Sequence, residues 1–346
     1  MRLYRHRIVG GEGSTEGSPE KKQMPNGLAN SRNTCYVNTT LQCLLHSQFI
    51  PRALLAQHPN DVMTSPLLRT LLDTFAQLLN SSPASVVNPH GLLEVLKVTL
   101  APLMNIYEQN DMQEFLIILL ERMVDAIAKI TPPPAAPPLP TKDADADADA
   151  EEHWHACLKP DFSLMKEAIY GQSITHITCG HCGKDHFAYD IFTTLMLPVR
   201  DETSNVRDCM NAYAARETLA PSEWKCDACG TRSDGNTRSL RFSRLPHVLI
   251  LCLNRSRETM RKNNAVVELP PELAVVGGAQ TRVYRLSSVA CHSGNAMSGH
   301  YYALCRHFDH AWYRIDDAMV FPLAPPTHDL PKAASSDAYV VFYTMH

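Results

Sequence analysis

The chain has 346 residues, about two domains' worth as a prior, and 45% of them are hydrophobic, which excludes global disorder. Thirty-two basic and 36 acidic side chains give a net charge of −4, so no basic field favours nucleic acid as a partner. No apolar run reaches the roughly 18 residues of a membrane span. The number of cysteines, eleven, is odd, and the N-terminal residues lack the apolar stretch of a signal peptide. Both features favour a reducing compartment. We expect a soluble intracellular protein.

Two segments lack any hydrophobic periodicity. Residues 1–25 are rich in Gly, Ser, Glu and Lys, which is typical of a flexible leader. Residues 131–152 begin with prolines and continue with repeated Asp-Ala pairs, a stiff and acidic composition without an apolar face. This second segment carries a net charge of −5, so the remainder of the chain sums to +1. We expect a disordered, solvated insertion here.

The first third of the chain predicts a helical subdomain. Apolar residues recur at helical spacing from Tyr36 to Phe49, and Pro51 is expected to end that helix. A second helix is expected to begin at Ser65-Pro66, a capping residue followed by proline at the first helical position. A third is expected over Asn110–Ile130, where Asn110 and Gln113 have the spacing of a capping box.

After residue 152 the pattern changes to short strand-like runs that are rich in β-branched and aromatic residues. Helices first and strands later, without an alternating βαβ pattern, indicate an α+β fold whose second half is mostly antiparallel sheet. The expected runs are Ile174–Thr178, Phe187–Val199, Thr237–Asn254, Arg282–Cys291, His300–Arg306, Trp312–Val320 and Tyr339–Tyr343.

Cys35 opens the first predicted helix, where the helix dipole and the free backbone amides favour a thiolate. A lone cysteine there is more often a small buried hydrophobic residue. However, His300 begins a later strand-like run and Asp316 follows about a hairpin further on. Such a pair can act as a base and its orienting carboxylate for a cysteine nucleophile. Asn30 can supply a side-chain amide to an oxyanion, or it can be a turn residue.

Two Cys-x-x-Cys-Gly turns, Cys179 with Cys182 and Cys226 with Cys229, stand 43 residues apart. Four thiolates suit a tetrahedral zinc ion, and the spacing fits two turns that meet at the tip of long strands. The first turn also matches the dithiol motif of thioredoxin-fold isomerases, but that motif opens a helix, whereas a strand-like run follows here. A metal-free finger is the remaining alternative.

Three motifs in this order resemble those of the ubiquitin-specific proteases, which are papain-like deubiquitinases. Residues 27–42, Gly-Leu-Ala-Asn-Ser-Arg-Asn-Thr-Cys-Tyr-Val-Asn-Thr-Thr-Leu-Gln, resemble the cysteine box. Residues 108–115, Glu-Gln-Asn-Asp-Met-Gln-Glu-Phe, resemble the glutamine/aspartate box. Four stretches together resemble the histidine box: His292-Ser-Gly, Gly-His300-Tyr, the run 312–317 and the closing run 338–343.

The resemblance implies one catalytic domain, residues 26–346, with a helical thumb over about 26–130 and a palm and zinc fingers of antiparallel strands over about 153–346. It implies a thiol-dependent ubiquitinyl hydrolase that cleaves after the C-terminal glycine of ubiquitin. Cys35 is then the nucleophile, His300 the base, Asp316 its orienting partner and Asn30 an oxyanion donor. Asp317 is a second carboxylate whose division of roles with Asp316 stays open.

The resemblance also implies that Asp111, Glu114 and Tyr301 contact the ubiquitin tail. Two carboxylates suit a tail that contains arginines, although acids at a helix start also favour the dipole. A structural Zn²⁺ held by the four paired cysteines is implied as well.

Other readings stay open beside this one. The chain can be a catalytically silent ubiquitin-binding scaffold, because a fold alone does not guarantee activity, or a protease for another ubiquitin-like modifier. A zinc-ribbon nucleic-acid module requires a basic face that the composition does not provide. The substrate proteins and any activating partner cannot be read from the sequence.

Overall fold

A computed structural model describes residues 24–56, 64–128, 146–158, 164–200, 205–255, 262–295, 298–323 and 336–346. The expected leader, apart from its last two residues, and the proline-rich part of the expected insertion lie outside the described residues. No helix within the described ranges has the length and the apolar character required to cross a membrane.

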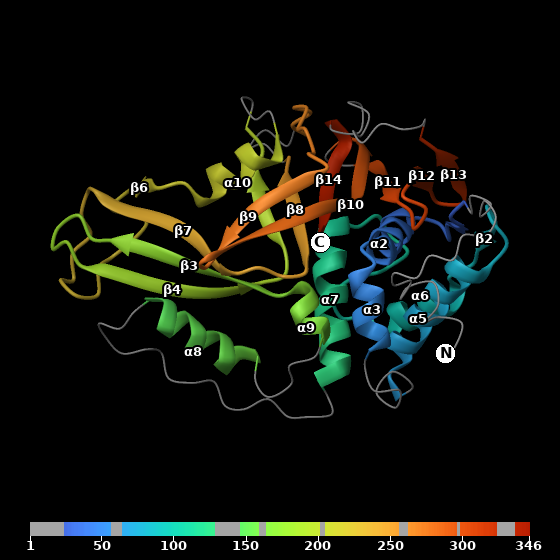
Figure 1. Ribbon diagram of the computed structural model, residues 1–346, viewed down its shortest axis with the longest axis horizontal. Helices are drawn as coiled ribbons and strands as arrows, with labels where there is room; N and C mark the ends of the chain where they lie inside the picture. The colour runs from blue at the N-terminus through green and yellow to red at the C-terminus, as the bar shows by residue number, and fades with distance from the viewer. Residues whose placement is uncertain are drawn as a thin grey trace, which may run out of the picture.

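A helical part, a large sheet and a small sheet make up the described fold (Figure 1). The helical part packs around α2, whose residues after Cys35 are all buried, as expected of a helix surrounded by others. Its helices are α2 (Cys35–His46), α3 (Phe49–Leu55), α5 (Pro66–Asn80), α6 (His90–Leu100) and α7 (Met112–Ala128), with the short parallel pair β1 (Gly27–Leu28) and β2 (Val86–Val87) beside them.

The helix α5 confirms the second predicted helix, since the Ser65 side chain accepts a hydrogen bond from the Leu68 amide and Pro66 follows at the first helical position. Two expected boundaries are wrong. Pro51 lies in the first turn of α3 rather than ending a helix, because proline there lacks only an amide that has no helical partner. The helix α7 is capped by Asp111 and not by Asn110, since Asp111 Oδ1 accepts from the amides of Gln113 and Glu114.

The large sheet has eight strands in the order β13-β12-β11-β10-β14-β8-β5, with β9 paired to β10. All of its pairs are antiparallel except β5 with β8, a parallel pair that the sequence pattern did not indicate. Its strands are β5 (Leu195–Pro198), β8 (Val248–Asn254), β9 (Glu272–Gly277), β10 (Gln280–Gly294), β11 (Gly299–Arg306), β12 (Trp312–Asp316), β13 (Met319–Pro322) and β14 (Ala338–Met345).

The small sheet projects away from the helical part and has the strand order β4-β3-β7-β6, all antiparallel (Figure 1). Three predicted strand runs are each divided in the structure: Phe187–Val199 into β4 and β5, Thr237–Asn254 into β7 and β8, and Trp312–Val320 into β12 and β13. The elements of this region are β3 (Gly171–Thr178), β4 (Asp185–Phe192), β6 (Glu217–Leu219) and β7 (Asn236–Arg244), with the helices α8 (Ala146–Leu158), α9 (Leu164–Ile169) and α10 (Val206–Ala214).

The expected disordered insertion is wrong over its last residues, because 146–152 belong to α8. Ala150 and Trp154 are buried, and the Gln172 side chain donates to the Ala150 carbonyl. The Arg244 guanidinium lies 5.0 Å from the Trp154 ring centre. The Asp-Ala repeat hides this helix from a periodicity argument because alanine is too small to mark an apolar stripe.

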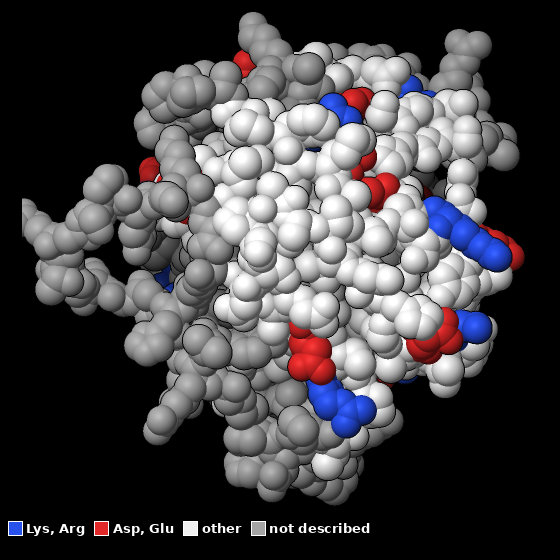
Figure 2. Space-filling model, turned by 90° about the vertical axis from the view of Figure 1, so that its right-hand side faces the viewer, with Lys and Arg blue, Asp and Glu red and all other residues white. Residues whose placement is uncertain are grey.

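The helical part docks onto one face of the large sheet through α2, which lies against β10 and β11. Ser288 donates to the Cys43 carbonyl at 3.2 Å and Thr344 to the Ser47 carbonyl at 3.0 Å. On the face seen in Figure 2, the described Lys and Arg side chains are scattered among Asp and Glu, and neither sign forms a continuous patch. Two sequence-distant halves thus meet along α2, through β10 and β11 and at its C-terminal end.

Candidate active site

Cys35 is the first residue of α2 and is partly buried. Burial raises the pKa of its thiol, the backbone amide of Tyr301 lowers it by a hydrogen bond, and the charge of Asp317 raises it. The Tyr301 amide belongs to β11, so the contact ties the start of α2 to the residue that follows His300. In the described residues no hydrogen bond joins the Cys35 sulfur to His300.

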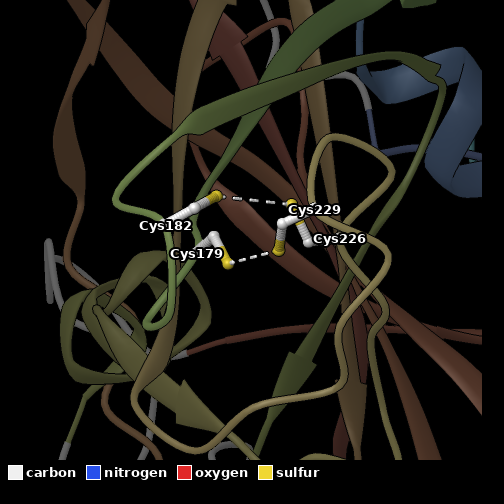
Figure 3. Close-up of side chains that lie close together, drawn as sticks. All are labelled: Cys179, Cys182, Cys226 and Cys229. Atoms are coloured by element: carbon white, nitrogen blue, oxygen red, sulfur yellow. Dashed lines mark hydrogen bonds between the residues drawn. The ribbon is translucent and has the colours of Figure 1, made fainter.

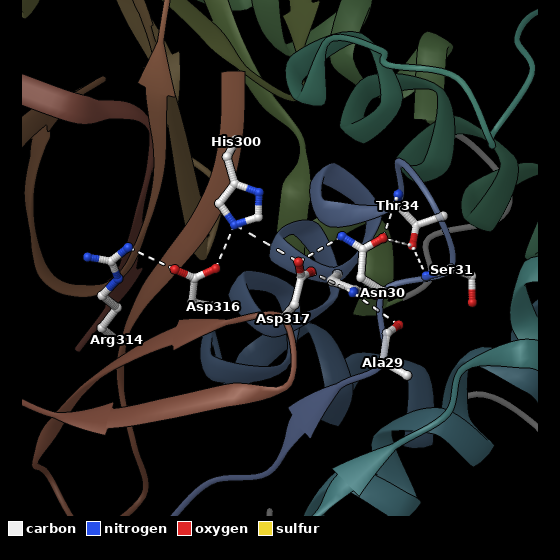
Figure 4. A network of polar contacts seen from close by, with 9 residues as sticks. Ala29, Asn30, Ser31, Thr34, His300, Arg314, Asp316 and Asp317 are labelled. Carbon is white, nitrogen blue, oxygen red and sulfur yellow. Dashed lines mark hydrogen bonds and ion pairs between the residues drawn. The ribbon is translucent and has the colours of Figure 1, made fainter. Parts of the chain in front are cut away.

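His300 and Asp316 lie on the neighbouring strands β11 and β12. His300 Nε2 is 2.6 Å from Asp316 Oδ1, and the other carboxylate oxygen accepts from Arg314 Nη2 at 2.8 Å (Figure 4). Because Nε2 faces the carboxylate, Nδ1 is the ring nitrogen left to take a proton from a thiol. The arrangement is a histidine whose ring is oriented by an acid.

Asp317 occupies the turn between β12 and β13 at φ 51°, a left-handed conformation that aspartate tolerates better than most residues. Its two carboxylate oxygens accept from Asn30 Nδ2 at 2.7 Å and from Asn38 Nδ2 at 2.8 Å (Figure 4). His300 Nε2 is 4.0 Å from Asp317 Oδ2, well beyond its distance to Asp316. Asp317 therefore holds amides, whereas Asp316 holds the imidazole.

The loop before Cys35 is fixed from within. The Asn30 side-chain carbonyl accepts from the Thr34 amide and from the Thr34 hydroxyl, each at 3.1 Å. The Thr34 hydroxyl in turn accepts from the Ser31 amide at 2.9 Å (Figure 4). The orientation of Asn30 is thus set at both ends of its amide, by this loop and by Asp317.

A cavity of about 330 Å³ opens in front of Cys35. The expected tail-binding residues Asp111 and Tyr301 line it, whereas Glu114 does not. Asp111 is held by the Tyr339 hydroxyl, which donates to its Oδ2 at 2.5 Å. The lining also includes His292, Arg255, Lys262 and Asn33. The cavity therefore brings one carboxylate and two buried cations close to the thiol.

The four expected zinc ligands come together at the tip of the small sheet, two from the turn between β3 and β4 and two from the loop between β6 and β7 (Figure 3). All four sulfurs lie within 4.8 Å of one another. Cys179 Sγ is 3.9 Å from Cys229 Sγ, and Cys182 Sγ is 3.8 Å from Cys226 Sγ. A tetrahedron with Zn–S bonds of about 2.3 Å has edges of about 3.8 Å, so the cluster can hold a metal ion.

The two turns that carry these cysteines have the same backbone form. In each, the backbone carbonyl of the first cysteine accepts a hydrogen bond from the backbone amide of the glycine four residues later, Gly183 at 3.0 Å and Gly230 at 2.8 Å. Both glycines have positive φ, 69° and 71°, which glycine adopts without strain. Hydrogen bonds from the Cys182 and His181 backbone amides and from neighbouring thiols lower the pKa of the Cys179 thiol to about 6, whereas burial and the neighbouring thiols raise that of Cys182 to about 11. Cys179 is thus the sulfur of this pair that ionises first.

His300, Asp316 and Asp317 also satisfy the spacing of a metal site. Their carboxylate oxygens, however, already accept from Arg314, Asn30 and Asn38. The group therefore has the chemistry of an oriented base rather than that of a ligand cage.

Sequence reasoning missed Arg314, Asn38, Lys262 and Tyr339, which contact or surround the site. Asn38 lies three residues after Cys35, close to one helical turn, and that spacing is a signal that could have found it. Arg314 lies two residues before Asp316 on one strand, so the period of two could have found it. Lys262 and Tyr339 reach the cavity only through tertiary packing.

A family model described as ubiquitin carboxyl-terminal hydrolase matches residues 26–343. The chain belongs to this family. Human ubiquitin carboxyl-terminal hydrolase 21 is 29% identical to it, over 92% of this chain and 61% of the relative. Rat ubiquitin carboxyl-terminal hydrolase 2 is 30% identical, over 92% of this chain and 54% of the relative. The chain thus spans less than two thirds of the length of either relative.

Solved structures of the SAGA DUB module, Ubp8 with Sgf11, Sus1 and Sgf73, have the same fold. One, bound to monoubiquitin, superposes with a TM-score of 0.71 at 21% identity, over 96% of this chain and 72% of that chain. Another, bound to ubiquitin aldehyde, gives 0.70 at 22% over the same shares. The expected α+β papain-like fold with thumb, palm and fingers is confirmed, the three parts being the helical part, the large sheet and the small sheet.

Proposed function

We propose that this hydrolase removes ubiquitin from proteins by cleaving the bond after ubiquitin's C-terminal glycine, with Cys35, His300 and Asp316 as a catalytic triad. The observation that carries the proposal is the 2.6 Å contact of His300 Nε2 with Asp316, on the strand whose Tyr301 amide reaches the Cys35 sulfur. Membership of the hydrolase family supports it.

In the proposed reaction His300 Nδ1 takes the Cys35 proton, and the sulfur attacks the carbonyl carbon of the last glycine. Burial raises the pKa of the thiol, so an adjacent base is required to make the nucleophile. The tetrahedral intermediate collapses as His300 protonates the departing amine, which leaves a thioester. Water, deprotonated by His300, then attacks the thioester, and the carboxylate of ubiquitin and the Cys35 thiol are regenerated.

The oxyanion of each tetrahedral intermediate needs donors that are already in place. The backbone amide of Cys35 and the Asn30 side chain are proposed to provide them. One Asn30 N–H already donates to Asp317, so the second N–H is the one available. In this division Asp316 orients His300 and Asp317 positions Asn30.

The proposed path of the ubiquitin tail runs through the cavity in front of Cys35. Asp111 at its wall supplies negative charge for arginine side chains of the tail, and Tyr301 supplies a ring beside the thiol. Glu114 is exposed on the first turn of α7 and is proposed to contact the tail outside the cavity. Ubiquitin and ubiquitinated proteins are therefore the proposed partners.

The cysteine cluster is proposed to hold a structural Zn²⁺ through Cys179, Cys182, Cys226 and Cys229. The bound ion would cross-link the two turns and stabilise the fingers. His186 Nε2 lies 3.3 Å from Cys226 Sγ and can donate to that thiolate from outside the ligand set.

We further propose that residues 26–346 form one catalytic domain. We also propose an intracellular location, since none of the eleven cysteines, all within the described ranges, forms a disulfide.

A ubiquitin that carries an electrophile at its C-terminus tests the proposed activity. The full chain should form a covalent adduct, Cys35→Ala should form none, and the exposed control Cys157→Ala should react like the wild type. Absence of an adduct with the wild type, or an adduct that survives Cys35→Ala, would reject the proposal. Probes built on other ubiquitin-like modifiers, run beside it, decide which modifier is preferred.

Metal analysis of the purified full chain tests the zinc proposal. One zinc per chain is expected, with loss of that zinc in Cys226→Ser and retention in Cys157→Ser. A wild-type chain without zinc contradicts the proposal.

A further inference from the structure

Arg314 lies against the proposed catalytic acid on the side away from the base. It precedes Asp316 by two residues on β12, so both side chains project from the same face of the strand. Arg314 Nη2 donates to Asp316 Oδ2 at 2.8 Å, while Oδ1 of the same carboxylate faces His300 (Figure 4). The carboxylate is therefore held at both of its oxygens.

The Arg314 side chain is itself held in place. Its guanidinium carbon lies 4.1 Å from the centre of the Tyr302 ring on the adjacent strand β11, a contact that fixes the plane of the fork. The Tyr302 hydroxyl donates to Asp337 Oδ2 at 3.2 Å. Lys262 Nζ lies 3.5 Å from Asp337 Oδ1 and also lines the cavity in front of the thiol.

The charge of Arg314 acts on the same carboxylate. Burial alone raises the pKa of Asp316, and hydrogen bonds from His300 and Arg314 outweigh it, so that the pKa lies below its usual value. Because the Arg314 charge stays positive at every accessible pH, it keeps Asp316 ionised. It also offsets part of the negative charge that Asp316 presents to the imidazolium.

We propose that Arg314 is a positioning residue of the reaction: it clamps the Asp316 carboxylate onto His300 and sets the pH range in which His300 works. The inference rests on the proposed function, since it assigns His300 and Asp316 their roles in that reaction. Arg314 is not among the described residues that line the cavity in front of the thiol.

The other charged and titratable groups around His300 come from several elements. Cys35 lies on α2 and His292 on β10, where burial and, to a lesser extent, the charges of Lys262 and His300 lower the pKa of His292. Asp317 lies 4.0 Å from His300 in the turn after β12, and its charge is shared with two amides. In the described part of the chain, Arg314 is the cation in contact with Asp316.

Removal of the Arg314 charge should therefore shift the pH dependence of the reaction in one direction, to higher pH. In Arg314→Met, the protonated imidazole loses a nearby repelling charge, so the limb of the pH–rate profile that reports His300 should move to higher pH by about half a unit. The loosened carboxylate should lower kcat about 10-fold or more, with a smaller change in KM. Arg314→Lys keeps the charge but not the stacked fork, so its limb should stay near the wild-type position while kcat falls.

The experiment measures kcat and KM for a fluorogenic ubiquitin C-terminal amide from pH 5.5 to 9.5, together with the rate at which iodoacetamide alkylates Cys35. Arg285→Met is the matched control, because this arginine on β10 is similarly exposed, 37% against 42%, and pairs with Glu272 instead of Asp316. Melting temperatures of all variants identify any loss of folding, and Arg314→Gln replaces the methionine variant if it does not fold.

A shifted limb in Arg314→Met with an unshifted limb in Arg314→Lys supports the proposal. Limbs that coincide with the wild type in both Arg314→Met and Arg314→Gln overturn it, whatever their kcat. If the wild type does not cleave the ubiquitin amide, the proposed function fails, and the alkylation profile of Cys35 alone then decides the role of Arg314 by the same two criteria.

Discussion

Asp316 and Asp317 are adjacent in the chain, yet their carboxylates have different partners. Asp316 faces His300 at 2.6 Å, whereas Asp317 accepts from Asn30 and Asn38. The sequence could not assign the two roles. Side chains alternate in direction along a strand, but this alternation ends at the turn, where Asp317 lies. The positive φ of Asp317 makes that division in the folded chain.

Asparagine substitutions at these two positions should separate the roles. Asp316→Asn should lower kcat about 10³- to 10⁴-fold, since the imidazole loses the charge that selects its tautomer. Asp317→Asn should lower kcat about 10²-fold by freeing Asn30, the proposed oxyanion donor. The measurement is kcat on a ubiquitin C-terminal amide together with Cys35 alkylation against pH.

Alkylation has no oxyanion to stabilise, so Asp317→Asn should lower kcat without slowing alkylation, and its alkylation profile should move only towards lower pH, because the charge that raises the pKa of the Cys35 thiol is lost. Asp316→Asn should impair both readouts. Equal effects of the two substitutions on both readouts would contradict the assignment.

At the scale of single elements, α8 shows how a repetitive composition conceals a helix. Only one face of the Asp-Ala repeat meets the rest of the protein: Ala150 is 2% exposed, whereas Ala148 is exposed. Two acidic side chains pair with arginines of β7, Asp147 with Arg241 at 2.7 Å and Glu151 with Arg244. In a solvated linker both alanines would be exposed, whereas in a helix packed against the protein only one of them is.

Ala150→Asp should therefore destabilise the protein by about 1–3 kcal/mol, because it buries a carboxylate without a partner. Ala148→Asp, with the same chemistry on the exposed face, should stay within about 0.5 kcal/mol of the wild type. Urea unfolding of both variants measures the difference. If the two free energies of unfolding are equal, residues 146–150 do not pack as described.

The C-terminal end of α2 carries a buried histidine pair. His46 Nδ1 lies 2.8 Å from the Gln42 carbonyl, which can only accept, so His46 Nε2 must accept from His307 Nδ1 at 3.0 Å. Burial, together with the smaller effect of the His307 charge, lowers the pKa of His46 to about 3. Neutral His46 is thus part of the contact between α2 and the loop after β11.

This pair predicts a loss of stability in acid. Between pH 6.5 and 3 the unfolded chain binds a proton at His46 that the folded chain does not, so the free energy of unfolding falls as the pH falls. From pH 7 to pH 5 the loss from this group is about 2 kcal/mol. Urea unfolding at both pH values should show that His46→Gln, although less stable at pH 7, loses about 2 kcal/mol less than the wild type over this range. An equal loss in both proteins is the contrary result.

At the scale of the molecule, the site is assembled from residues that lie far apart in the chain. Asn30 and Asp317 are 287 positions apart, and Asn38 and Asp317 are 279 apart. Motifs singled out the proposed triad residues and the four cysteines that cluster in the structure, because their local sequences carry the chemistry. Lys262 and the helix α8 were not predictable, since their places in the fold come from packing between elements that no local pattern records.

The thumb and the palm must therefore approach closely where β1 meets the turn after β12. The Leu28 amide donates to the Asp317 carbonyl at 2.8 Å. A Cβ atom on Gly27 would lie 2.6 Å from the Ala318 carbonyl oxygen and 2.7 Å from that of Asp317. Both are backbone atoms that cannot rotate away, so only glycine permits this approach.

Gly27→Ala should push the turn away from the Asn30 loop by a fraction of an ångström or more and so loosen the Asn30–Asp317 contact. We expect kcat on a ubiquitin amide to fall about 10-fold or more and the free energy of unfolding to fall by about 1–3 kcal/mol. Gly91→Ala is the matched control, because a Cβ there meets nothing within 4 Å and alanine favours the helix α6. It should keep full activity with equal or higher stability. If Gly27→Ala also keeps full activity, the close approach of thumb and palm does not position Asn30, and the role of Asp317 would have to be sought elsewhere.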